Sequence, residues 1–126
     1  MKTIKCTSYF FAAVLPSMTQ VVFANDDKYI KAMEENIAVV YSARTPADLQ
    51  RSINAFDRIA ATETDKWEPL YYQSFGYLML ANLEKEGSKK DHYLDLAFTA
   101  LEKGKKIRPE ESELLALEGF AYMLRV

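Results

Sequence analysis

The chain has 126 residues with 16 basic and 18 acidic side chains, which gives a formal net charge of −2. This mildly negative charge argues against a general electrostatic attraction to nucleic acid or to an anionic membrane. The sequence contains one cysteine and one histidine. It therefore cannot form an internal disulfide, and it lacks the second histidine that a two-histidine zinc motif needs.

The first 24 residues predict an export signal. Lys2 and Lys5 supply a positive start, the apolar segment YFFAAVL follows at residues 9–15, and residues 22–24 (VFA) fit a signal-peptidase site. Pro16 and several polar residues interrupt the apolar segment, so it falls short of the roughly 18 apolar residues of a spanning helix. We expect an exported protein, periplasmic or associated with the cell surface, that contacts the membrane only if the signal stays uncleaved.

Cleavage after Ala24 would change the length, the net charge and the cysteine content of the chain. Residues 25–126 would remain, about 102 residues, which suit one small domain. Loss of Lys2 and Lys5 would leave 14 basic and 18 acidic side chains, a net charge of about −4. Cys6 would also be lost, so the mature domain would depend on packing alone.

Apolar residues recur at three- and four-residue steps along the rest of the chain, which predicts amphipathic helices. The first stripe contains Tyr29, Ile30, Met33, Ile37, Val40 and Tyr41. Thr45, Pro46 and Asp48 then supply a cap, a proline at the first helical position and an acid three residues after the cap. These three residues predict the start of a second helix. Its stripe contains Leu49, Ile53, Phe56, Ile59 and Ala60.

Three further helices are predicted downstream. The third opens at residues 65–69 and runs to about Glu86, with Gly87 as its expected stop. The fourth begins near Ser88 and carries Tyr93, Leu94, Ala97, Phe98 and Leu101. The fifth begins near Glu110 and carries Leu114, Leu115, Leu117, Phe120 and Leu124. No strand pattern competes with these helices, and the short links between them favour antiparallel neighbours.

Small, aromatic and proline residues recur at a regular spacing along the helices. The downstream set is Ala97, Leu101, Gly104, Pro109, Gly119 and Tyr122, and the upstream set is Ser52, Phe56, Ser74 and Tyr77. This pattern resembles the tetratricopeptide repeat (TPR) family, whose unit is a helix pair of about 34 residues. The sequence departs from that pattern at Leu101, where the family often has an aromatic residue, and at Thr64, which replaces a proline. About 11 extra residues between Tyr77 and Ala97 would also lengthen both helices.

The resemblance implies an all-α fold in which antiparallel helix pairs over residues 25–126 stack as a short TPR-like α-solenoid with an incomplete last unit. It also implies a non-catalytic scaffold that binds a peptide or protein partner in a groove lined by the first helix of each pair. The groove-facing positions of the family fall on Tyr71, Phe75, Leu78 and Met79. An unrelated helical bundle is the alternative fold.

Aromatic side chains are unusually dense on the third predicted helix. Trp67, Tyr71, Tyr72, Phe75 and Tyr77 all lie there, and helical geometry prevents all five from facing one core. We expect most of them to pack between helices, as aromatic side chains usually do. The others would line the groove, where aromatic residues and methionine suit adaptable protein recognition.

The sequence carries no recognisable catalytic motif. Its four glycines are far apart, which argues against a phosphate-binding loop, and no nucleophile elbow surrounds a serine. His92 and Asp95 could share a metal ion, although an acid near a helix start is favourable without one. We expect no catalytic residue, no metal and no cofactor. The alternative is a helical accessory domain of an enzyme whose catalytic part lies beyond Val126.

Two charged clusters flank the link between the fourth and fifth helices. They are Glu110, Glu111 and Glu113, and Lys103, Lys105, Lys106 and Arg108. Acids at a helix start and bases at a helix end both offset the helix dipole, so a structural role is expected for each. An anionic partner is the alternative for the basic cluster. Nucleic acid is disfavoured because the chain is acidic and carries an export signal.

The chain ends at Val126, inside the first helix of what would be a third unit. Leu117, Phe120 and Leu124 would then lack the second helix that normally covers such residues, whereas terminal units of repeat arrays usually carry a polar outer face. We expect either a longer protein or a covering chain. In isolation, the C-terminal helix should mediate self-association or fray.

Overall fold

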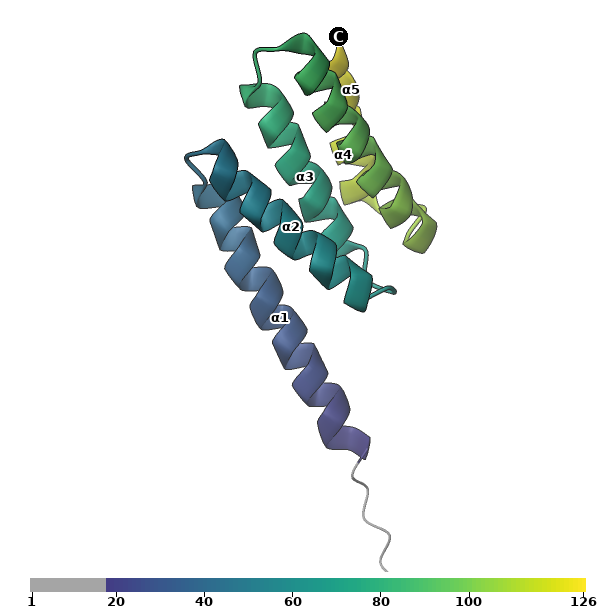
Figure 1. Ribbon diagram of the computed structural model, residues 1–126. Coiled ribbons are helices and arrows are strands. Elements are labelled where there is room, and N and C mark those ends of the chain that lie inside the picture. The colour runs from purple at the N-terminus through teal and green to yellow at the C-terminus, as the bar shows by residue number, and fades with distance from the viewer. Residues whose placement is uncertain (1–17) are drawn as a thin grey trace, which may run out of the picture.

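The computed structural model describes residues 18–126, with side chains from residue 25 onwards. Its five helices are α1 (Met18–Ser42), α2 (Pro46–Thr62), α3 (Glu68–Leu83), α4 (Gly87–Ile107) and α5 (Ser112–Arg125), as Figure 1 shows. No strand occurs within this described range, so the predicted all-α class is confirmed. Residues 1–17 of the predicted signal peptide lie outside it.

Successive helices fold back on one another through short links (Figure 1). Helix α3 lies at the centre and contacts each of the other four helices. The odd-numbered helices contact one another in the order α1, α3, α5, whereas the backbones of α2 and α4 stay apart. This arrangement is that of a short helical solenoid in which the odd-numbered helices adjoin one another.

The start of α2 forms as the sequence predicts. The Asp48 amide donates a hydrogen bond to Thr45 Oγ1 at 3.2 Å, and Pro46 is the first helical residue. The Thr45 hydroxyl in turn donates to the Asp48 carboxylate at 2.8 Å. This hydrogen bond, more than nearby Arg51, lowers the pKa of Asp48. The reciprocal contacts fix the point where the chain enters the helix.

The turn between α3 and α4 differs from the prediction. Helix α3 ends at Leu83 rather than near Glu86, because the Glu84 carboxylate accepts the amides of Lys85 at 2.9 Å and Glu86 at 3.0 Å. Gly87 does not stop α3 but is the first residue of α4. The predicted extra length is found mainly in α4, which has 21 residues against 17 in α2.

Two core clusters share α3. The first joins α1, α2 and α3 and contains Met33, Val40, Leu49, Ile53, Phe56 and Leu80. The second joins α3, α4 and α5 and contains Leu78, Ala81, Leu94, Ala97, Leu101, Leu114, Leu117 and Ala121. Neighbouring helices therefore share an apolar interior that runs through α3 along the stack.

Several residues of the predicted apolar stripes differ in burial from the prediction. On α1, Ile30 and Tyr41 are exposed, because α1 packs only one side against α2 and α3. On α5, Leu117 is buried in the second cluster and Phe120 is packed against it, which contradicts the expectation that both lack cover. Leu124 also packs against that cluster. The large apolar residues of α5 that stay exposed are Leu115, Met123 and Tyr122, although the Tyr122 ring packs against Phe98 of α4 with centroids 4.8 Å apart.

Small residues set the distance between the helices. The Ser74 hydroxyl of α3 is fully buried and donates to the carbonyl oxygen of Ala97 on α4 at 3.0 Å. The Ser52 hydroxyl of α2 donates to the carbonyl oxygen of Asn36 on α1 at the same distance. On the other side of α3, a Cβ atom added to Gly76 would lie 2.5 Å from Ile53 Cγ1. Helix α3 can therefore approach α2 only with glycine at this position.

Gly76→Ala should lower the free energy of unfolding by about 1–3 kcal/mol, because the added methyl group overpacks the α2–α3 contact. Urea unfolding of the two proteins measures the difference. Gly119→Ala is the matched control, since nothing lies within 4 Å of a Cβ at this helical position. The control should gain up to about 1 kcal/mol from helix propensity. An unchanged or raised stability of Gly76→Ala would contradict the close contact.

Candidate partner-binding groove

The predicted groove residues lie on α3, between α1 and α5. Tyr71, Phe75 and Met79 are half-buried and recur at four-residue steps, so they share one face of the helix. Leu78 does not belong with them. Its side chain is completely buried in the cluster that joins α3 to α4 and α5, because it lies four residues after Ser74 on the face that meets α4. The assignment of Leu78 to the groove is therefore wrong.

Aromatic rings from α1 and α3 form a continuous row. Trp67 packs edge-on against Tyr71 with ring centroids 6.1 Å apart, and Tyr71 packs against Tyr72 at 5.0 Å. Tyr41 of α1 lies 6.5 Å from Tyr72 and 5.5 Å from Phe75. We call these five residues the aromatic row. Sequence periodicity placed Tyr41 in the core stripe of α1, so its position in this row was missed.

A shallow apolar cavity opens at the Phe75 end of the aromatic row. It has a volume of about 240 Å³ and is lined by Val40, Tyr41, Ala43, Leu49, Phe75, Met79, Asn82 and Leu83. Two large side chains of its lining, Tyr41 and Leu83, are 64% and 55% exposed. Exposed apolar side chains around an apolar hollow are typical of a site that a partner side chain fills.

The hydroxyls of Tyr71 and Tyr72 remain protonated well above neutral pH. Burial, and then the negative charge of Glu113 on α5, raise the pKa of Tyr71. Burial, and then Tyr41 and Glu113, raise the pKa of Tyr72. The two phenol groups can therefore donate hydrogen bonds. The exposed Glu113 carboxylate brings a negative charge to the Tyr71 end of the groove, away from the cavity at Phe75.

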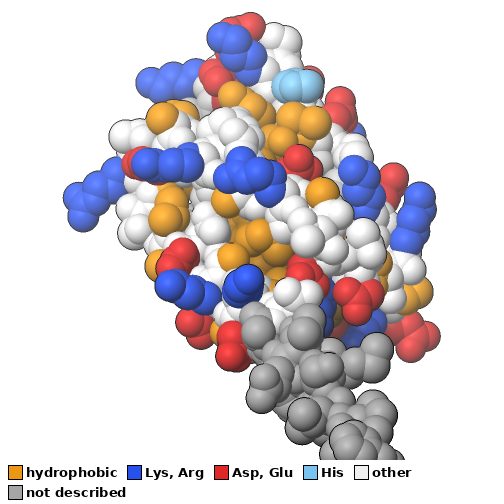
Figure 2. Space-filling model, turned by 60° about the horizontal axis from the view of Figure 1, so that its bottom comes forward, with side chains coloured by type: hydrophobic (Ala, Val, Ile, Leu, Met, Phe, Trp, Pro, Cys, Tyr) orange, Lys and Arg blue, Asp and Glu red, His pale blue; other side chains and the backbone are white. Residues whose placement is uncertain are grey.

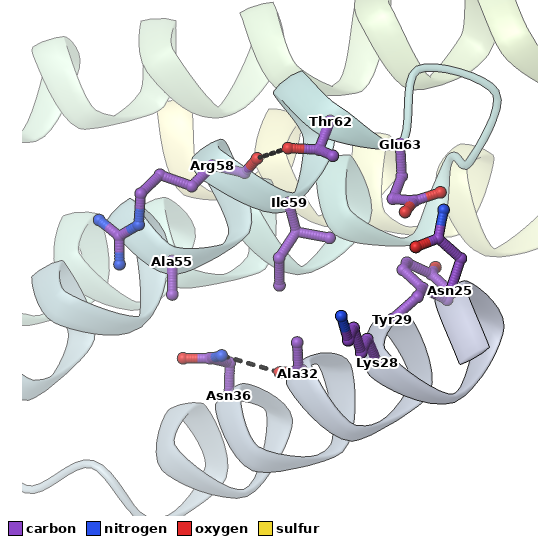
Figure 3. A pocket seen from close by; sticks show the side chains of 10 residues that line it. All are labelled: Asn25, Lys28, Tyr29, Ala32, Asn36, Ala55, Arg58, Ile59, Thr62 and Glu63. Atoms are coloured by element: carbon purple, nitrogen blue, oxygen red, sulfur yellow. Dashed lines mark hydrogen bonds between the residues drawn. The ribbon is translucent and has the colours of Figure 1, made fainter. Parts of the chain in front are cut away.

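A second and larger cavity lies between α1 and α2 (Figure 3). Its volume is about 420 Å³, and its lining consists of Asn25, Lys28, Tyr29, Ala32, Asn36, Ala55, Arg58, Ile59, Thr62 and Glu63. The small side chains of Ala32 and Ala55 leave this space between the two helices. The Asn36 amide and the Thr62 hydroxyl both donate to carbonyl oxygens of their own helices, at 2.8 and 3.1 Å. These two polar groups are thus occupied within the helices.

The charged residues singled out in the sequence do not converge on one site. Asp95 binds Arg125 of α5, and the ring of His92 lies beside Tyr93 with centroids 6.2 Å apart. Lys105 of the basic cluster binds Glu118, which links α4 to α5. Within residues 25–126, no group of three or more metal-ligating side chains could hold an ion.

The outer surface mixes both signs of charge. On the face shown in Figure 2, Lys and Arg side chains alternate with Asp and Glu, and hydrophobic side chains form several small patches between them.

Among the described helices, none is both long and apolar enough to cross a membrane.

Comparisons with family models, with curated proteins and with solved structures found no match for this chain. The resemblance to TPR proteins therefore depends on the residues and the helix geometry described above, and it stays a prediction.

Ionisation of the tyrosines should make stability fall at alkaline pH. The native state holds the protons of Tyr71 and Tyr72 more tightly than the unfolded chain does, because the folded pKa values are raised. The contribution of these tyrosines to the free energy of unfolding should therefore be constant below about pH 10, the pKa of an unperturbed tyrosine, and should decrease as the pH rises above it. Urea unfolding at increasing pH measures this loss. Tyr71→Phe should reduce the alkaline loss relative to the wild type, with the exposed Tyr122→Phe as control. Parallel pH curves for the wild type and Tyr71→Phe would refute the assignment.

Proposed function

We propose that this protein is a non-catalytic, TPR-like scaffold that binds a segment of a protein partner in the groove along α3. The observation that carries the proposal is the apolar cavity beside the aromatic row, with exposed Tyr41 and Leu83 in its lining. The groove lies on the side of the stack where α1, α3 and α5 meet. A concave surface of this kind is the usual binding surface of helical repeat proteins.

The size of the cavity favours a peptide side chain over a complete small molecule. Its volume of about 240 Å³ is below the roughly 300–1,000 Å³ of small-molecule pockets. A single bulky apolar side chain of a partner would fill it as an anchor. At the other end of the aromatic row, Glu113 and the Tyr71 hydroxyl favour a basic group. The groove therefore suits a segment with an apolar anchor and a lysine or arginine.

The helix crossings support the TPR part of the proposal. In that family, small residues allow the two helices of a unit to cross closely. Here Ser74 bonds to the backbone at Ala97, and both residues occupy those positions of the family pattern. Gly104, at the next small position, would bring a Cβ atom to 3.0 Å from a methyl group of Leu114 on α5. Two of the predicted small positions, Ser74 and Gly104, thus lie at close contacts between neighbouring helices.

The competing hypothesis, a helical accessory domain of an enzyme, has less support from the described residues. The groove offers apolar side chains, phenols and one carboxylate, and no nucleophile lies beside a base in it. The larger cavity between α1 and α2 likewise combines Lys28, Arg58 and Glu63 without a histidine or cysteine. A scaffold accounts for the groove along α3 without further assumptions.

Export belongs to the same proposal and predicts a defined N-terminus. Cleavage after Ala24 would start the mature chain at Asn25, with Asp26 and Asp27 in the first turn of the shortened α1. Asparagine caps helices well, and acids in the first turn offset the helix dipole. N-terminal sequencing of protein from the native host should begin at Asn25. Recovery of intact Met1 in a membrane fraction would show an uncleaved anchor instead.

Replacing exposed groove residues should weaken partner binding while leaving the fold intact. The double variant Tyr41→Ala/Leu83→Ala should lose at least about tenfold in partner capture, because the anchor loses two walls of its cavity. Its stability should fall by less than about 1 kcal/mol, since both side chains are exposed. Partner capture is measured by site-specific crosslinking in the host periplasm. The amount of the wild-type protein's crosslinked product is then compared with the amount of the same product formed by the variant.

Two matched variants separate binding from folding. Ile30→Ala removes an equally exposed apolar side chain outside the groove, and it should capture the partner like the wild type. Leu78→Ala empties a buried site and should cost about 2–5 kcal/mol of stability. Equal capture by the wild type and the Tyr41→Ala/Leu83→Ala variant would rule out the groove.

A further inference from the structure

Helices α3 and α5 carry the same sequence pattern at a constant offset of 45 residues, the distance from Ser74 to Gly119. Glutamate, leucine, phenylalanine and tyrosine repeat at this offset, and small residues replace small residues. The identical pairs are Glu68 and Glu113, Leu70 and Leu115, Phe75 and Phe120, and Tyr77 and Tyr122. Helix α5 therefore repeats part of the sequence pattern of α3.

The two helices differ in what covers them. The face of α3 that meets α4 contains Leu70, Ser74 and Leu78, with exposures of 7%, 0% and 0%. The equivalent face of α5 contains Leu115 and Met123, which are 48% and 73% exposed, and Gly119, which is also exposed. We call the residues Leu115, Gly119 and Met123 the α5 face. These three positions, which are buried on α3, are thus open on α5.

Gly119 has no role within the isolated chain. Glycine inside a helix costs about 1 kcal/mol relative to alanine, and a Cβ atom at Gly119 would meet nothing within 4 Å. The buried helical glycines behave differently. Gly76 lies against Ile53, and Gly104 lies against Leu114, each at a close contact with a neighbouring helix. By the same logic, Gly119 marks the crossing point of a helix that approaches the α5 face.

We infer that the α5 face binds one amphipathic helix of another protein, which crosses α5 at Gly119 as α4 crosses α3 at Ser74. Helix α4 shows which side chains fit. Ala97 lies at the crossing, with Leu94 one turn before it and Leu101 one turn after it, and all three are buried. The partner helix therefore carries a small residue between two leucines at the same spacing. This surface is separate from the groove along α3.

Helices α2 and α4 of a second copy do not offer such a helix. The small-residue sides of α2 and α4 are already occupied, because Ser52 bonds to Asn36 on α1 and Ala97 bonds to Ser74 on α3. Charge also favours one direction for the partner. Glu113 lies at the start of α5 and Arg125 at its end, so an antiparallel helix places its basic C-terminal turn near Glu113. Helix α4 likewise ends with Lys105 and Lys106, and Lys105 binds Glu118 of α5.

A synthetic peptide with the α4 sequence, residues 87–107, is the probe for the α5 face. Added to the full chain, it should bind saturably and gain helicity, because an isolated helix of this length is marginal in water. Calorimetry and circular dichroism measure these two effects. Gly119→Phe should weaken binding at least about tenfold by blocking the crossing. Gly119→Ser should bind like the wild type, since serine occupies the equivalent position on α3.

Each other outcome overturns the inference. Absence of saturable binding up to about 1 mM would show that the α5 face does not accept such a helix. Equal binding by Gly119→Phe would show that the peptide displaces the chain's own α4. Dimers of the full chain that Gly119→Phe dissociates would identify a second copy as the occupant. Tyr41→Ala/Leu83→Ala should leave peptide binding unchanged, so failure of the groove and failure of the α5 face are distinguishable.

Discussion

The close contact between α2 and α3 at Gly76 is the constraint on which the rest of the structure depends. Helix α3 packs against all four other helices, so it must be apolar or small around most of its circumference. At Gly76 the space for a side chain is already filled by Ile53. On the opposite side, Ser74 satisfies its hydroxyl by bonding to the α4 backbone. Small residues thus let one helix serve two core clusters at once.

The same constraint explains which parts of the structure the sequence could predict. Helix α2 has one apolar face and a strong cap at Thr45 and Pro46, and both its start and its buried residues Leu49, Ile53 and Phe56 are as predicted. On α3, apolar residues lie all around the helix, so periodicity cannot separate groove from core. The assignment of Leu78 to the groove failed for this reason, whereas Tyr71, Phe75 and Met79 do share a half-buried face.

Other features depend on contacts between distant segments and leave little signal in the sequence. Tyr41 belongs to a regular apolar stripe, yet it lies in the aromatic row because the end of α1 reaches α3. The cavity between α1 and α2 arises from Ala32 and Ala55, which are ordinary helical residues. The 45-residue offset was visible in the sequence, but its meaning depends on burial. Only the contrast between covered Ser74 and exposed Gly119 shows that one face of α5 is open.

Contacts in this stack join only helices that are at most two elements apart along the chain. Such low contact order favours rapid folding that begins within one helix pair and adds neighbours in turn. Helix α1 contacts only α2 and α3 and borders the cavity of about 420 Å³, so it has the fewest interactions to resist local opening. Because α1 also carries Tyr41, an occupant of the groove would hold this helix in place. Binding in the groove and the ordering of α1 would then be thermodynamically linked. Local opening of α1 would therefore control how readily a partner binds along α3.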